Sequence, residues 1–312
     1  MSAPPTYYGQ PVIKQPVWRA EIPWYLFAGG MAGASAGLAC VSELRGSRVL
    51  ARRAWAVALA GVGVSPALLV ADLGRPARFL NMLRVFKVTS PMSVGSWVLA
   101  ASAAATSVSA INTFTGRLRT VALAAKPAAG LLGLPLSTYT GALLAQTAVP
   151  VWREARDELP ALFAAGAAAS AGAAACVLTP VADAAPARRL ALLGAAAELA
   201  TAPLMQRRLG ELAEPYRTRG AAATFGHAAR GLTAAGATLV AARGARSRVA
   251  AGAGGALLLA GAVCERWSVF RAGFESARDP VYTVAPQRRR IDQGHARGGA
   301  VRLGPARTQT QR

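Results

Sequence analysis

The chain has 312 residues, of which 53% are hydrophobic and only 16% are charged, whereas soluble domains carry about 25% charged residues. The formal net charge of +21 comes almost entirely from arginines. These arginines stand at the ends of long apolar segments, which suits loops that meet lipid headgroups better than a nucleic-acid interface. We therefore expect an integral membrane protein that contacts membrane lipid and does not bind nucleic acid.

The sequence up to residue 183 contains five apolar segments that are each long enough to cross a bilayer, which takes about 20 residues in a helix. The residues that precede the first segment lack the basic start and apolar core of a signal peptide, so we expect the first segment to be retained. The first two segments are residues 22–42 and 54–71. The other three lie between Lys87 and Arg117, between Lys126 and Arg153, and between Glu158 and Asp183.

The second half predicts three more helices, over residues 190–206, 221–242 and 249–270. The sequence thus predicts an all-α integral membrane protein with about eight transmembrane helices in two four-helix bundles. The expected domains are an N-terminal segment at the partner face, two bundles and a polar basic tail; their bounds are 1–21, 22–152, 153–271 and 272–312. The loops on the side of both termini carry more arginine and lysine, so we expect that side to face the cytoplasm.

The densest group of polar residues lies in the stretch DLGRPARFLNMLRVFKVTSPMSVGSW, residues 72–97. Its basic side chains are spaced so that several of them share one face of a short interfacial helix, beside an apolar face. Such a segment suits a ligand with a polar head and an apolar tail. A positively charged loop that only orients the helices explains the same pattern, and both interpretations stay open.

Three polar side chains inside predicted membrane helices are candidates for a functional role. The hydroxyl of Tyr139 requires a hydrogen-bond partner in an apolar surrounding, either on a neighbouring helix or on a ligand. Glu198 and Arg230 are rare charges for a membrane interior. If their helices touch, they form either a structural ion pair or part of a proton route.

Ligands for redox metals are scarce in the sequence. The three cysteines, Cys40, Cys176 and Cys264, belong to three different segments, and no CxxC pair occurs. The two histidines, His227 and His295, do not suit a pair of facing haem ligands. We expect no haem and no iron–sulfur cluster in this chain.

The stretch of residues 72–97 resembles the hallmark loop of the NrfD/PsrC family, the membrane subunits of polysulfide reductase type. YYGQPVIKQPVWRAEIPWYLFAGGMAG resembles the start of that family, and LSTYTGALLAQTAVPVWREARDELP resembles its fourth helix and the following loop. ARDPVYTVAPQRRR resembles the tail of a subgroup that occurs with formate-dehydrogenase-like partners.

The resemblance implies a respiratory electron-transport subunit that is not catalytic alone, in the cytoplasmic membrane of a bacterium. It implies a quinone, expected to be menaquinone, in the first bundle, a ferredoxin-like iron–sulfur subunit and a molybdopterin catalytic subunit. By the same resemblance, Tyr139 bonds a quinone oxygen, Glu21 lies near the pocket mouth, and Asp72 and Arg75 form the pocket floor or its proton route. The expected partner-docking residues are Arg78, Asn81, Arg84 and Lys87.

Two other functions remain open from the sequence. The first is a membrane anchor that docks partner subunits but has lost quinone chemistry. The second is a secondary transporter or proton pump, which Glu198 and Arg230 would serve.

Overall fold

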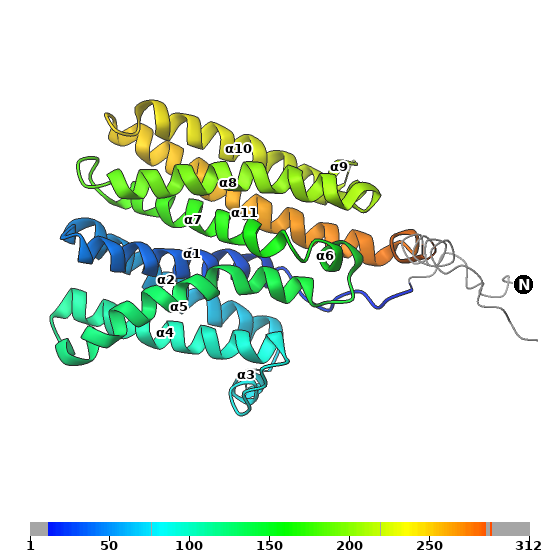
Figure 1. The fold of residues 1–312 in the computed structure, drawn as a ribbon, viewed down its shortest axis with the longest axis horizontal. Coiled ribbons are helices and arrows are strands. Elements are labelled where there is room, and N and C mark those ends of the chain that lie inside the picture. Colours follow the sequence, from blue (N-terminus) through cyan, green and yellow to red (C-terminus); the bar gives the residue numbers. More distant parts are fainter. Residues whose placement is uncertain (1–11, 76, 219, 285–287, 289–312) are drawn as a thin grey trace, which may run out of the picture.

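The structure is a computed structural model that describes residues 12–75, 77–218, 220–284 and 288. Within these residues the chain is helical and contains no strand, and eight long helices run side by side (Figure 1). The expected all-α membrane protein is confirmed. The long helices are α1 (Glu21–Leu44), α2 (Arg48–Leu73), α4 (Pro91–Thr115), α5 (Arg119–Ala145), α7 (Leu159–Leu178), α8 (Ala185–Leu209), α10 (Ala221–Arg243) and α11 (Arg248–Arg278).

Six of these helices are long and apolar enough to cross a membrane, namely α1, α2, α4, α5, α7 and α11. Helix α8 has the length but begins and ends with arginine pairs and holds Glu198 in its middle. Six spans are therefore supported by length and hydropathy, and the crossing of the membrane by α8 and α10 stays a prediction.

Helices α1, α2, α4 and α5 pack against one another, and so do α7, α8, α10 and α11. Helices α1 and α5 also pack on α7, so the division into two bundles near residue 153 stays a prediction. Small residues bring the backbones close, as is common in membrane proteins. A Cβ atom at Gly33 of α1 would lie 2.5 Å from the carbonyl oxygen of Gly133 on α5.

Short helices gather at one end of the molecule, beside the N-terminal segment (Figure 1). They are α3 (Ala77–Met82), α6 (Pro150–Glu154), the 3-10 helix η1 (Gly210–Ala213) and α9 (Glu214–Arg217). The short helix expected within residues 72–97 exists, but it holds only Arg78 among the basic residues of that stretch. Helix α11 continues past the expected boundary at residue 271 to Arg278, and the end of the tail, with His295, lies outside the described residues.

One carboxylate connects the four helices of the first group. Near the C-terminal end of α1, Glu43 Oε1 accepts hydrogen bonds from Trp55 Nε1 of α2 at 3.1 Å and from Thr113 Oγ1 of α4 at 3.3 Å. Lys126 Nζ of α5 completes the set with an ion pair of 2.9 Å to Glu43 Oε2. The carboxylate therefore fixes how these helices meet.

Glu43→Gln is expected to lower the free energy of unfolding by about 1–3 kcal/mol, because the amide keeps the size but loses the charge that Lys126 faces. Thermal unfolding in detergent measures the loss. Lys126→Met, alone and combined with Glu43→Gln, completes a double-mutant cycle. Losses that simply add would contradict a coupled pair.

Candidate functional site

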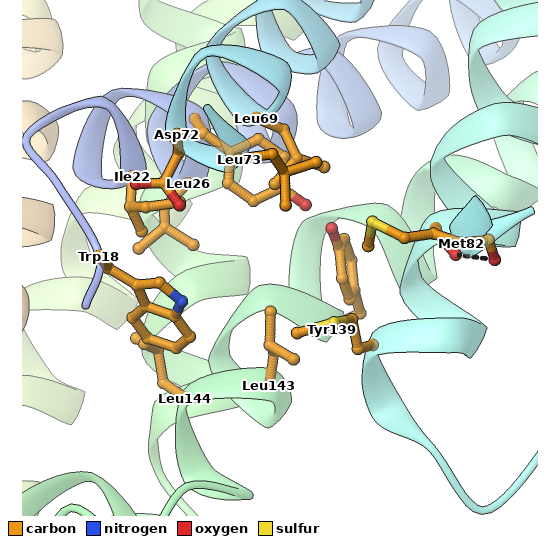
Figure 2. Close-up of a pocket in the computed structure, with 13 residues that line it drawn as sticks. Trp18, Ile22, Leu26, Leu69, Asp72, Leu73, Met82, Tyr139, Leu143 and Leu144 are labelled. Carbon is orange, nitrogen blue, oxygen red and sulfur yellow. Dashed lines mark hydrogen bonds between the residues drawn. The ribbon is translucent and has the colours of Figure 1, made fainter. Parts of the chain in front are cut away.

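A pocket opens at the end of the first group of helices where α3 and the N-terminal segment lie. Its open space is about 60 Å³, and its wall is mostly apolar. In Figure 2, Asp72 and Trp18 stand on one side of this space, and Tyr139 and Met82 lie across it. The lining residues are Trp18, Ile22, Tyr25, Leu26, Leu69, Asp72, Leu73, Met82, Met92, Ser96, Tyr139, Leu143 and Leu144.

Helix α5 carries Tyr139 into the pocket, and α4 makes room for its ring. A Cβ atom on Gly95 of α4 would lie 2.7 Å from Tyr139 Cδ2 and nearer still to Cε2, so only glycine fits beside the ring. The hydroxyl of Tyr139 makes no hydrogen bond to any residue that the structure describes. The neighbouring Ser137 instead donates to the carbonyl oxygens of Gly133 and Gly30, so it serves helix packing, whereas Tyr139 lines the pocket.

Asp72 lies in the last turn of α2, which ends at Gly74 in the left-handed conformation. Its Oδ1 accepts a hydrogen bond of 2.8 Å from the backbone nitrogen of Arg19. This bond holds the N-terminal segment across the end of α2 and keeps Trp18 in the pocket wall. The carboxylate is thus fixed at the boundary between the apolar pocket and the polar end of the bundle.

The serines that precede and begin α4 hold the loop that closes the pocket. Ser90 caps the helix by accepting from Ser93 N, and Ser93 Oγ donates to Val85 O at 2.9 Å and accepts from Lys87 N at 3.0 Å. Ser96 Oγ donates to Met82 O at 3.3 Å, the dashed line in Figure 2. The sequence SPMSVGSW therefore positions α3 against α4 and seats Tyr139.

A known protein family matches most of this chain. The family described as polysulfide reductase, of the NrfD type, matches residues 5–278. The chain belongs to this family. Its members are quinone-interacting membrane subunits of redox complexes and work with iron–sulfur and catalytic subunits. No curated protein sequence matches the chain.

The pocket contains two of the four residues that the NrfD resemblance assigned to quinone, Tyr139 and Asp72. Arg75 is exposed just after α2, and Glu21 is half-buried at the start of α1; neither lines the cavity. The four expected docking residues are exposed on α3 and the loop that follows it: Arg78, Asn81, Arg84 and Lys87. Of the four, Arg78 also donates a long bond of 3.4 Å to Leu73 O.

Sequence reasoning missed several pocket residues in this NrfD-type chain. Tyr25 is 2% exposed and lines the pocket, whereas its neighbour Trp24 is 45% exposed. Helical spacing could have indicated that Tyr25 is buried, because Ile22, Tyr25 and Leu26 fall on the same face of α1. Trp18 had no such signal, because it precedes the helix.

The expected pair of Glu198 with Arg230 does not form among the described residues. Glu198 Oε1 accepts a hydrogen bond of 3.2 Å from Thr233 Oγ1, and Arg230 contacts Gly226 O and His227 Nδ1, each at 3.3 Å. The charge nearest to Glu198 belongs to helix α11 instead: beside Gly166, Glu198 Oε2 faces the guanidinium of Arg266.

The pocket is small for a quinone ring. Its 60 Å³ holds roughly four water molecules at about 15 Å³ each. Met82 and Met92 stand in its wall, and methionine side chains adapt easily to a new neighbour. None of the residues of α3 is buried. A ligand larger than this space would have to displace the side chains on this side of the pocket.

Proposed function

We propose that this chain exchanges electrons between a docked iron–sulfur subunit and a quinone whose ring lies in the pocket of Tyr139 and Asp72. The observation that supports the proposal is the hydroxyl of Tyr139, which faces an apolar cavity without a hydrogen-bond partner among the described residues. An acceptor oxygen on a flat apolar ligand is the partner that this arrangement suits.

The residues present fit a quinone. Aromatic and aliphatic side chains offer flat contacts to its ring, and Gly95 leaves the space in which Tyr139 is held. A quinone takes up two electrons and two protons when it is reduced. Tyr139 would donate a hydrogen bond to one ring oxygen, and the carboxylate of Asp72 would hold a proton at the mouth of the pocket. Trp18 and Leu73 would keep bulk water away.

The partner would dock on the end of the bundle that carries the pocket. Arg78, Arg84 and Lys87 are exposed there, and their charge suits an acidic surface on the partner. Arg75 and Glu21 lie at the same end, at the ends of α2 and α1, where they would border the route by which protons reach Asp72.

The proposed complex comprises a ferredoxin-like iron–sulfur subunit and a molybdopterin catalytic subunit in the cytoplasmic membrane of a bacterium. Both termini of this chain would be cytoplasmic, and the quinone would be menaquinone. Purification of the tagged chain in mild detergent, with mass spectrometry of co-purifying proteins and extraction of quinone, tests the assembly. A co-purifying partner without quinone would favour a membrane anchor. A chain that purifies alone, with no partner and no quinone, would favour a transporter.

Tyr139→Phe is expected to lower quinone turnover of the purified complex by roughly tenfold, because one hydrogen bond of about 1 kcal/mol or more is lost at the ring. Steady-state rates with a soluble quinone measure the loss. Tyr282→Phe is the control, since Tyr282 lies at the same end but donates to Glu214 Oε2. Equal rates for Tyr139→Phe and the unmodified complex would remove Tyr139 from the site.

A further inference from the structure

A second polar site lies among the helices of the second group. Glu198 of α8 and the neighbours Glu265 and Arg266 of α11 are 3%, 5% and 2% exposed. All three lie well inside long helices. Charged side chains in such surroundings are costly and are kept where they serve a function.

Polar atoms of this cluster lack partners. Glu198 Oε2, Arg266 Nε and Arg266 Nη1 are buried without a hydrogen bond, and so is the hydroxyl of Tyr216 on α9. Arg266 makes one hydrogen bond, from Nη2 to Phe163 O of α7 at 2.9 Å, and its guanidinium lies 4.0 Å from the centre of the Phe163 ring. Buried polar groups of this kind are usually satisfied by ordered water.

Gly166 of α7 opens the space between the acid and the base. A Cβ atom there would lie 2.5 Å from Glu198 Oε2 and 2.8 Å from Arg266 Nη2, so the two side chains face each other across this point. Their charged atoms lie more than 4.0 Å apart, so the two side chains do not form an ion pair. A gap of this kind between opposite charges is one that a single water molecule bridges.

The buried cluster contains more acidic groups than basic groups. The enclosed groups are two carboxylates and one guanidinium. Arg230 of α10 is half-buried and bonded to His227 and Gly226, and its charge acts on Glu265 from a distance without an ion pair. The other groups that face the cluster are the phenol of Tyr216 and, beyond it, Glu275, which accepts from Ala222 N. A second ionised carboxylate would therefore stand in an apolar interior without a contacting cation, which is strongly unfavourable.

We propose that this cluster is a hydrated proton-holding site, in which a water molecule bridges Glu198 and Arg266 while the carboxyl groups of Glu198 and Glu265 share one proton at neutral pH. Uptake converts one carboxylate into a carboxyl group and consumes one proton from water, and release reverses it. No electron moves in this step.

This site is separate from the quinone pocket. Its buried charged residues come from α8 and α11, whereas the described pocket residues come from the N-terminal segment and from α1 to α5. Helix α7 lies between the two: its Phe163 carbonyl holds Arg266, and the helix also packs on α1 and α5. The proton-holding site does not rest on quinone chemistry, so its test can be read without turnover.

Infrared spectroscopy of the full complex tests the proposal through the carbonyl stretch of a protonated carboxyl group, which shifts in D2O. The unmodified protein is expected to show this band at neutral pH, and Glu198→Gln is expected to remove or shift it. Glu265→Gln is expected to change the same band, and it replaces Glu198→Gln as the test variant if that protein does not fold. Asp157→Asn is the control, because Asp157 is an exposed partner of Arg208 and lies outside the cluster.

Gly166→Ala tests the bridging water, because its methyl group would occupy the space between Glu198 and Arg266. The band is then expected to move and to respond differently to D2O. Gly63→Ala, whose methyl group would meet no atom within 4 Å, should leave it unchanged. Absence of the band in the unmodified protein, or a band that is the same in both glutamine variants, would overturn the shared proton. An unchanged band in Gly166→Ala would overturn the bridging water.

Discussion

Gly95→Ala is expected to lower quinone turnover by roughly tenfold to a hundredfold while the complex still assembles. The added methyl group would lie 2.7 Å from Tyr139 Cδ2, closer to Cε2, and 3.1 Å from Cζ. Carbon atoms do not approach so closely, so either the ring turns or α4 moves away from α5. Overpacking of this kind costs about 1–3 kcal/mol. The hydroxyl stands at the far end of the ring and moves the most.

Two further variants separate the loss of the site from a general loss of stability. Gly63→Ala adds the same methyl group on α2, where it meets no atom within 4 Å, and should leave turnover unchanged. Tyr139→Leu combined with Gly95→Ala relieves the overlap, because leucine has no ring at the position of Cε2. This double variant should regain the melting temperature but not the turnover. A recovery of both would show that Gly95 matters for packing alone and that Tyr139 does not touch the quinone.

The long helices could be predicted from sequence because each is a long apolar segment with charges at its ends, a local property. Their bounds differ where tertiary contacts extend a helix. Helix α11 continues to Arg278 because Phe274 packs with Trp152 and Phe270 beyond the expected end. The composition there is polar and arginine-rich, and it does not reveal that one face of the helix is buried against α6.

The site was predictable only in part. Tyr139 and Asp72 line one pocket because the end of α2 and the last third of α5 face the same space. The resemblance implied this arrangement, and the residue pattern alone did not. The seat that Gly95 gives to Tyr139 depends on how closely α4 approaches α5. The sequence prediction paired Glu198 with Arg230. It missed Arg266, because Arg266 lies on α11, far along the chain from Glu198, and only the packing of the helices brings the two side chains together.

The second large effect is expected at Trp152, where the two groups of helices and the N-terminal segment meet. This side chain of α6 is fully buried, and its Nε1 donates a hydrogen bond of 2.7 Å to Val269 O of α11. Its ring stacks on Trp18 with centroids 5.6 Å apart. A Cβ atom on Gly273 would lie 2.5 Å from Trp152 Nε1, so α11 has no side chain where the indole lies.

Trp152→Ala is expected to lower the free energy of unfolding by about 3–5 kcal/mol, the range found when a large buried aromatic side chain is removed. Thermal unfolding in detergent measures this loss. Trp24→Ala is the matched control, since Trp24 is 45% exposed on α1 and its removal leaves no internal cavity.

Trp152 also acts on the pocket, because Trp18 is held on one side by Trp152 and is placed by the bond from Arg19 to Asp72. Loss of the stacking partner should free residues 12–20, so limited proteolysis should cut this segment faster in Trp152→Ala than in Trp24→Ala. Quinone affinity should fall with it, since Trp18 forms one wall of the cavity. A variant that melts early but keeps its quinone affinity and its protected N-terminal segment would show that Asp72 alone holds that segment in place.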